Sequence, residues 1–266
     1  MTAVRDRDEA TTLDDMMARA AALVPTLEAR SRETNALRRI PDATMVDLKA
    51  AGVFRVQQPA RCSGYEFDFG ALVHVSAKLA EGCASSAWIA SVVASHHWIV
   101  GMFAADAQDD VWGTDPDAIV CSAYAHSDAT AVPEGSGYRI NGTWHYASGI
   151  DHADWVIVLI PVNEGSDEPR MTTVLVPRKD FVVLDTWHAS GLKGTGTNDL
   201  RIAEVFVPGH RELGFDEANQ GTPPGTAVNS AHIYKLPMMG VGSFTTIGPC
   251  FGVAQGVLDA YLAGMK

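Results

Sequence analysis

The stretch from Asn141 to Gly149 combines residue types that suit a flat heteroaromatic ligand. An Asn-Gly turn leads into a predicted strand in which Tyr146 and Ser148 lie two residues apart. Because side chains alternate between the two faces of a strand, we expect this ring and this hydroxyl to share one face. The ring can then pack on a planar ligand while the hydroxyl binds a ring nitrogen. A half-buried strand with a surface serine explains the pattern equally well.

The adjacent residues His96 and His97 form a second candidate. Neighbours on a helix point about 100° apart, so the two rings are poorly placed to bind one metal ion. His96 shares a helical face with Trp88, because steps of three and four residues return to the same side. A buried, hydrogen-bonded core histidine is the simpler interpretation. The functional alternative is a hydrogen-bond donor to a substrate or a proton relay.

Other catalytic motifs are absent from the sequence. It has no dinucleotide fingerprint, no phosphate-binding Walker loop, no G-x-S-x-G elbow and no HExxH zinc motif. The segment Gly194–Thr197 could bring backbone amides to a phosphate, but its spacing favours a tight turn. The four cysteines have no metal-like spacing, which predicts free thiols and no metal site.

Composition narrows the class of protein. The chain has 266 residues, of which 47% are hydrophobic, and a net charge of -12, which favours a soluble globular protein and argues against nucleic-acid binding. Residues 1–9 contain no apolar stretch typical of a signal peptide. The most apolar run, residues 155–160, is too short to span a bilayer. We therefore expect a cytoplasmic protein without a membrane partner.

The elements that position these residues change in type along the chain. Helical spacing predicts helices after Thr12, from Pro41 to Gly52 and from Ser85 to Phe103, and a breaker cluster follows at residues 113–116. Short runs rich in β-branched and aromatic residues then predict antiparallel strands at residues 118–121, 138–140, 155–160, 171–176 and 200–207. An apolar helix is expected from about Thr245. The predicted units are residues 1–116 (helical), 117–225 (β) and 226–266 (helical), an α+β fold.

Several segments in this order resemble one protein family. They are Cys83–Trp98, Asn141–Asp154, Trp187–Asn198 with Val205–Pro208, and Asn229–Pro237. The chain resembles the oxygenase components of two-component flavin-dependent monooxygenases, of the kind that hydroxylate steroid-ring phenols or act in pigment production. These belong to the acyl-CoA dehydrogenase superfamily. The resemblance implies an N-terminal helical domain, a central antiparallel β domain and the start of a C-terminal helical bundle.

The resemblance also implies roles for individual residues. Two residues would be catalytic. Ser148 would hydrogen-bond flavin N5 and slow the loss of peroxide, with Tyr146 packed near the flavin ring. His96 would face a phenolic substrate and help to orient or deprotonate it, with Trp88 as an aromatic wall. The remaining implied positions line the flavin and substrate cavity or lie close to it: Ser122, which would contact both ligands, Tyr124, Ala125 and Lys235.

The implied reaction is hydroxylation of an aromatic substrate by O2 and reduced FMN or FAD, through a flavin C4a-hydroperoxide. An NAD(P)H-dependent flavin reductase would supply the reduced flavin. Family members form tetramers and carry an essential histidine beyond the segment matched here, so the resemblance implies a C-terminally truncated chain. Two alternatives stay open: an acyl-CoA dehydrogenase with tightly bound FAD, and an inactive remnant of an enzyme.

Overall fold

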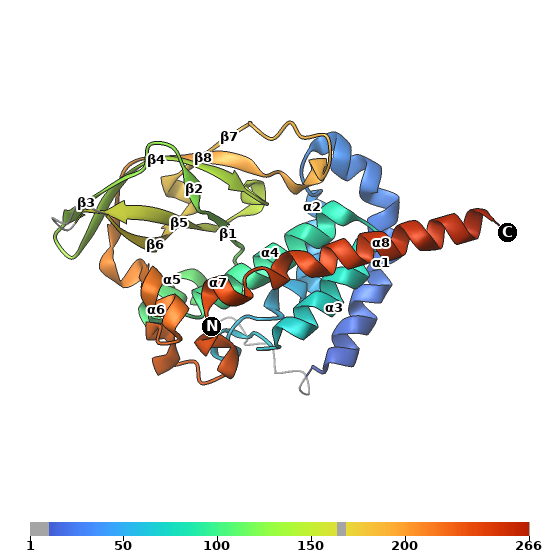
Figure 1. Cartoon of the computed structure of the whole chain (residues 1–266), viewed down its shortest axis with the longest axis horizontal. Coiled ribbons are helices and arrows are strands. Elements are labelled where there is room, and N and C mark those ends of the chain that lie inside the picture. The colour runs from blue at the N-terminus through green and yellow to red at the C-terminus, as the bar shows by residue number, and fades with distance from the viewer. Residues whose placement is uncertain (1–10, 164–168, 266) are drawn as a thin grey trace.

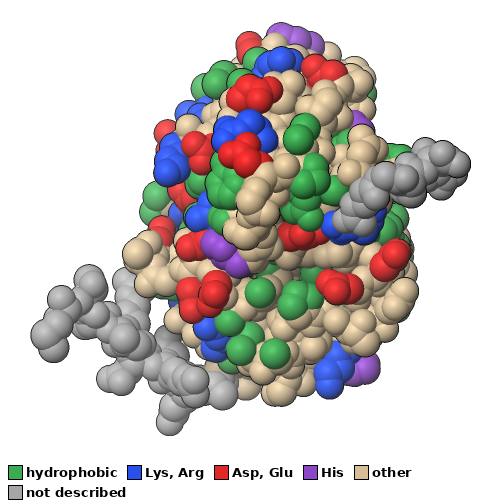
Figure 2. Space-filling model, turned by 90° about the vertical axis from the view of Figure 1, so that its left-hand side faces the viewer, with side chains coloured by type: hydrophobic (Ala, Val, Ile, Leu, Met, Phe, Trp, Pro, Cys, Tyr) green, Lys and Arg blue, Asp and Glu red, His purple; other side chains and the backbone are tan. Residues whose placement is uncertain are grey.

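A computed structural model describes residues 11–163 and 169–265. Residues 1–9, for which the sequence predicts no signal peptide, lie outside this range. A twisted sheet occupies one side of the molecule and the long helices the other, with α4 (Ala84–Val100) running between them, and short helices also lie below the sheet (Figure 1). The face in Figure 2 carries acidic and basic side chains interspersed, so this face offers no basic stripe to a nucleic-acid backbone.

From Thr11 onward, where the described chain begins, the α-helices that precede the sheet are α1 (Leu13–Leu37), α2 (Asp42–Ala50), α3 (Phe69–Ala80), α4 (Ala84–Val100) and α5 (Ala105–Trp112). The expected start of α1 is confirmed, because Thr12 and Asp15 form a reciprocal capping box. The predicted helix at residues 85–103 is confirmed as α4, whose side chains are buried along nearly its whole length. A helix enclosed in this way holds its side chains in fixed positions, which suits a site. The helices α3 and α5 were not predicted from the sequence.

The sheet contains β1 (Val120–Ala123), β2 (Ala125–His126), β3 (Thr130–Glu134), β4 (Gly137–Ala147), β5 (Trp155–Val162), β6 (Arg170–Pro177), β7 (Val182–Leu184), β8 (Asn198–Pro208) and β9 (Glu212–Gly214). Its main order is β7-β8-β4-β3-β5-β6-β9, and β1 pairs with β5. The expectation of a purely antiparallel sheet is wrong in two places, because β1 and β3 both pair with β5 in parallel. The result is a mixed sheet in an α+β fold.

The α-helices that follow the sheet are α6 (Phe215–Gln220), α7 (Met238–Val241) and α8 (Phe244–Gly264). The first half of α8 packs closely on α3, since a Cβ atom on Gly248 would lie 2.0 Å from the Ser76 hydroxyl. The Ser91 hydroxyl of α4 also donates to the Thr245 carbonyl at 2.6 Å. The second half of α8 projects from the body of the molecule (Figure 1). Its exposed apolar residues include Val257, Leu258, Tyr261 and Leu262.

The run from Met238 to Gly264 is long and apolar enough to span a membrane by length and composition. This run is longer than residues 155–160, which the sequence had indicated as the most apolar stretch, and an apolar run of this length was not predicted. Core helices of soluble proteins pass the same test, and the beginning of α8 is packed against α3 and α4. The run is therefore weak evidence for a membrane segment.

Candidate active site

Ser148 lies immediately after β4, where the chain turns through Gly149 with φ of +78°. The indole N–H of Trp88, on α4, donates to Ser148 Oγ at 3.2 Å. Ser148 Oγ also lies 2.9 Å from the Thr197 hydroxyl, which comes from the segment before β8. The fold thus brings together Trp88 and Ser148, which are 60 residues apart in the sequence. Thr197 is a partner that the sequence analysis did not identify.

Tyr146 does not share a strand face with Ser148, so this expectation is wrong. The pairing of β4 with β8 shifts register between Trp144 and Ala147, and Tyr146 adopts a left-handed backbone with φ of +64°. An inserted residue of this kind breaks the alternation of side chains. The Tyr146 side chain consequently turns outward and is 66% exposed.

His96 and Ser122 form a second polar cluster, between α4 and β1. His96 Nδ1 lies 3.1 Å from the Val120 carbonyl and Nε2 lies 2.8 Å from Ser122 Oγ. A carbonyl oxygen can only accept, so Nδ1 carries the proton. Burial lowers the pKa of His96 to about 4, which keeps the ring neutral at pH 7. Nε2 therefore accepts the Ser122 O–H, and His96 is both a buried histidine and a member of a directed polar pair.

The two clusters lie on the same helix. Trp88 and His96 are eight residues apart on α4, which corresponds to about 12 Å along the helix axis. This separation leaves room for a planar cofactor near Trp88 and a small ring near His96. Burial raises the pKa of the Tyr124 phenol to about 12, with the Ser122 hydroxyl opposing the shift, so the phenol is a neutral donor beside the second cluster.

Two other predicted residues are not part of these clusters. Ala125 is exposed on β2, where it pairs with His145. Lys235 is also exposed, and among the described residues no hydrogen bond joins it to Ser148 or Ser122. Its neighbour Ile233 accepts the Trp98 indole N–H at 2.7 Å, which fixes this segment at the C-terminal end of α4. The structure thus separates Lys235 from the Trp88 end of the helix.

His97 differs from His96 in its surroundings. Its ring is 1% exposed and meets Trp112 edge to face at 5.4 Å, and burial lowers its pKa to about 3. This is the environment of a core histidine. Across residues 11–163 and 169–265, no group of three or more His, Cys, Asp or Glu side chains could hold a metal ion.

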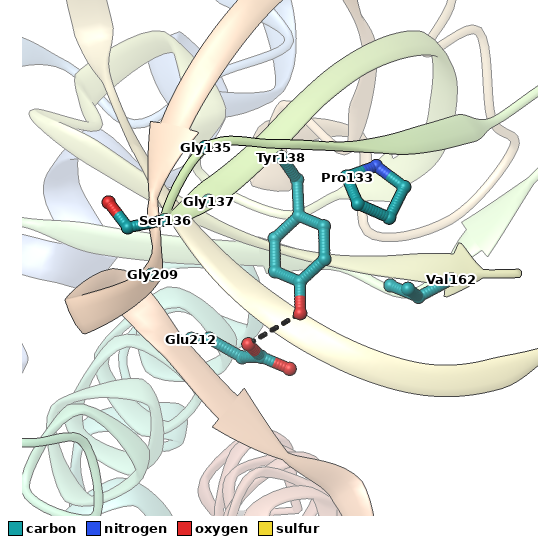
Figure 3. A pocket seen from close by; sticks show the side chains of 8 residues that line it. All are labelled: Pro133, Gly135, Ser136, Gly137, Tyr138, Val162, Gly209 and Glu212. Atoms are coloured by element: carbon teal, nitrogen blue, oxygen red, sulfur yellow. Dashed lines mark hydrogen bonds between the residues drawn. The ribbon is translucent and has the colours of Figure 1, made fainter. Parts of the chain in front are cut away.

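A surface hollow of about 210 Å³ lies elsewhere, at the turn between β3 and β4 (Figure 3). The Tyr138 hydroxyl points across it and donates to Glu212 at 2.8 Å (Figure 3). Tyr138 and Ser148 stand at opposite ends of β4, roughly 30 Å apart at the rise of an extended strand. The hollow therefore belongs to neither polar cluster.

The residues around Ser148 fit a flavin. The half-buried Ser148 hydroxyl offers a hydrogen-bond partner for a ring nitrogen, and the Trp88 indole lies against it. Tyr124 precedes Ala125 and Tyr146 follows His145 in the β2–β4 pairing, and both side chains are partly exposed. An oriented hydroxyl against an indole ring is a combination that suits a planar ligand.

Comparison with known proteins identifies relatives along nearly the whole chain. The oxygenase subunit HsaA of a flavin-dependent monooxygenase from Rhodococcus jostii is 39% identical over 246 residues, covering 92% of this chain and 64% of that protein. The FADH2-dependent resorcinol hydroxylase oxygenase component of a Rhizobium species is 34% identical, covering 93% and 61%. The crystal structure of HsaA from Mycobacterium tuberculosis superposes with a TM-score of 0.90 at 35% identity, covering 94% of this chain and 69% of that one.

No family model matches the chain. The chain spans 64% of the length of the Rhodococcus jostii relative, and its match to the solved HsaA structure extends over both the helices and the sheet described above. The Trp88, His96, Ser122 and Ser148 clusters all lie within this shared fold. On the combined strength of sequence and structure, the chain belongs to the oxygenase components of two-component flavin-dependent monooxygenases, which have the acyl-CoA dehydrogenase-like fold.

Proposed function

We propose that this chain serves in the hydroxylation of a phenolic ring by O2 and reduced flavin. The observation that carries the proposal is the pair of polar clusters along α4: Trp88 with Ser148, which would face the flavin, and His96 with Ser122, which would face the substrate. Its membership of an oxygenase family supports the same reaction. Because the Rhizobium relative is named as FADH2-dependent, we propose reduced FAD ahead of reduced FMN.

Ser148 and Trp88 would hold the flavin ring. Tyr146 would lie near this ring, and Tyr124 would line the cavity for flavin and substrate. When bound, reduced flavin supplies the O2-activating chemistry of the reaction. The protein's own contribution is to orient the ring and to keep water away from it. Ala125 and Lys235 would lie at the margins of this site, where exposed backbone and a flexible cation could meet the outer parts of the ligand.

Ser122 and His96 would bind the substrate hydroxyl. Ser122 directs its proton to His96 Nε2, so its oxygen is free to accept the O–H of a phenol. A phenol has a pKa near 10, about six units above that of His96, so full proton transfer to His96 would cost roughly 8 kcal/mol. The pair therefore orients the phenol and increases its electron density through a hydrogen bond. Complete deprotonation by His96 is the less favourable mechanism.

We also propose a partner reductase and an oligomeric state, from the family and from the exposed apolar surface of α8. An NAD(P)H-dependent flavin reductase would supply the flavin, and a tetramer would cover the apolar surface of α8 in a cytoplasmic protein without membrane or nucleic-acid partners. We propose functional units at residues 1–116, 117–225 and 226–266. An acyl-CoA dehydrogenase is not favoured, because the two relatives are named as a monooxygenase and a hydroxylase and the buried His96–Ser122 pair is poorly suited to an aliphatic chain.

The test is an aerobic assay with NADH, a flavin reductase, FAD and a set of simple phenols under 18O2. We expect a hydroxylated product that contains one labelled oxygen atom, formed in the presence of catalase and dependent on the chain. A reaction without the chain controls for chemistry caused by free reduced flavin. Absence of labelled product, together with reduction of a dye by an acyl-CoA substrate, would refute the hydroxylase function in favour of a dehydrogenase. Absence of both activities would indicate an inactive remnant.

A further inference from the structure

Ser148 stands at one end of a chain of hydroxyl groups. Its oxygen lies 2.9 Å from Thr197 Oγ1, which lies 2.6 Å from Thr195 Oγ1. Thr195 Oγ1 in turn lies 2.9 Å from the Leu192 carbonyl. At the other end, the Trp88 indole N–H reaches Ser148 Oγ at 3.2 Å. The three hydroxyls therefore lie between an indole N–H, which can only donate, and a carbonyl, which can only accept.

These two ends determine the direction of every hydrogen bond in the chain. The Leu192 carbonyl also accepts the Thr195 amide and the Trp187 indole N–H, each at 3.1 Å. Because this oxygen can only accept, its 2.9 Å contact with Thr195 Oγ1 needs the Thr195 hydroxyl proton between the two oxygens, so Thr195 Oγ1 must accept from Thr197. Thr197 has then used its proton, so its oxygen must accept from Ser148. Trp88 completes the series by donating to Ser148. Any reversed hydroxyl would leave one of these close contacts without a proton, which is costly for groups that are largely buried.

The backbone around the two threonines is held firmly. Thr195 and Thr197 are 1% and 8% exposed, respectively. The Gly149 amide donates to the Thr195 carbonyl at 2.9 Å, which ties this turn to the residue after Ser148. A Cβ atom on Gly194 would lie 2.2 Å from a Thr34 methyl group, so the turn packs closely against α1. The hydroxyl chain thus has a rigid support, and its direction is built into the fold.

The consequence for Ser148 is that it can only accept a further hydrogen bond. Its proton is committed to Thr197, one lone pair receives the Trp88 N–H, and one lone pair remains. Reduced flavin carries a hydrogen on N5, whereas oxidised flavin presents a lone pair there. A hydroxyl that can only accept matches the first state and leaves the second without a donor.

We propose that Thr197 and Thr195 are positioning residues that make Ser148 an obligate acceptor, and so make the site select the reduced state of its flavin. The inference rests on the proposed flavin site. It assigns the discrimination between redox states to two threonines beyond the residue that would touch the ligand.

The test compares Thr197→Val, which removes the hydroxyl at nearly constant shape, with Thr197→Ser, which keeps it. Affinities for reduced FAD are measured anaerobically and those for oxidised FAD in air, by fluorescence titration. In Thr197→Val the Ser148 proton is free to turn toward N5 of oxidised FAD. We expect oxidised FAD to bind about fivefold more tightly, reduced FAD to change little, and the midpoint potential of bound FAD to fall by about 20 mV. Thr197→Ser should behave as the parent.

Thr195→Val provides a second variant. It removes the oxygen that accepts the Thr197 proton, so Thr197 is free to donate to Ser148 instead. The ratio of the affinities for reduced and oxidised FAD should then also decrease. Circular dichroism establishes that each variant is folded. An unchanged ratio of the two affinities in folded Thr197→Val, with the parent still preferring reduced FAD, would overturn the inference and leave the proposed function standing. A parent chain that binds neither form of FAD would overturn the proposed function and this inference together.

Discussion

The neutral state of His96 predicts how the stability of the fold depends on pH. Burial lowers the pKa of this residue from 6.5 to about 4. Between these values the unfolded chain binds a proton that the folded chain does not, so folding stability falls as the pH falls. The stabilisation is fully present above pH 6.5 and is lost progressively toward pH 4. From these two pKa values, the loss between pH 7.5 and pH 5 is about 2 kcal/mol for this single residue.

The assay is urea unfolding followed by circular dichroism at pH 7.5, 6 and 5, for the parent chain and His96→Gln. The variant lacks the titrating group, so its unfolding free energy should fall by about 2 kcal/mol less than that of the parent over this range. His97 titrates in both proteins, and its pKa is lowered first by burial, which the substitution leaves in place, and second by the charge on His96, which the substitution removes. The control is His74→Gln, which removes an exposed imidazole from α3. Parallel pH profiles for the parent and His96→Gln would refute the neutral, proton-accepting state of His96.

Three further predictions concern the flavin site, the turn that supports it and the surface of α8. Ser148→Ala should weaken binding of reduced FAD about fivefold in an anaerobic titration, because one hydrogen bond is lost; unchanged affinity would remove this residue from the site. Gly194→Ala should lower the unfolding free energy by about 1–3 kcal/mol, whereas Gly191→Ala, with no atom within 4 Å of its added Cβ, should be nearly neutral in the same urea unfolding experiment; equal effects would contradict the close packing. Tyr261→Asp, on the exposed face of α8, should reduce self-association measured by light scattering, and a parent chain that is already monomeric would contradict the proposed assembly.

The parts of the fold that local sequence patterns could predict are those with local causes. Thr12 and Asp15 cap α1 within one turn, and the β-branched run after Trp155 forms β5 at the expected place. The helix α3 also had a local signal, since the Asp68 side chain accepts from the Ala71 amide at 2.9 Å as an N-cap. That signal was present in the sequence and was missed.

The details of the candidate site depend instead on contacts between distant segments. The outward turn of Tyr146 arises from a register shift against β8, more than 50 residues further along the chain. Thr197 meets Ser148 across 49 residues, and its own segment had indicated only a tight turn. The Gly-Thr-Gly-Thr spacing was the available signal, because alternate threonines can line up their hydroxyls once the glycines permit the close turn. The direction of their hydrogen bonds required the positions of Trp88 and Leu192.

The most direct test of the flavin site is an anaerobic crystal structure of the chain with reduced FAD. We predict that flavin N5 lies within hydrogen-bond distance of Ser148 Oγ, with the isoalloxazine ring beside Trp88 and the ring face that reacts with O2 toward the His96–Ser122 pair. FAD bound away from Ser148, for example in the hollow between Tyr138 and Glu212, would contradict it.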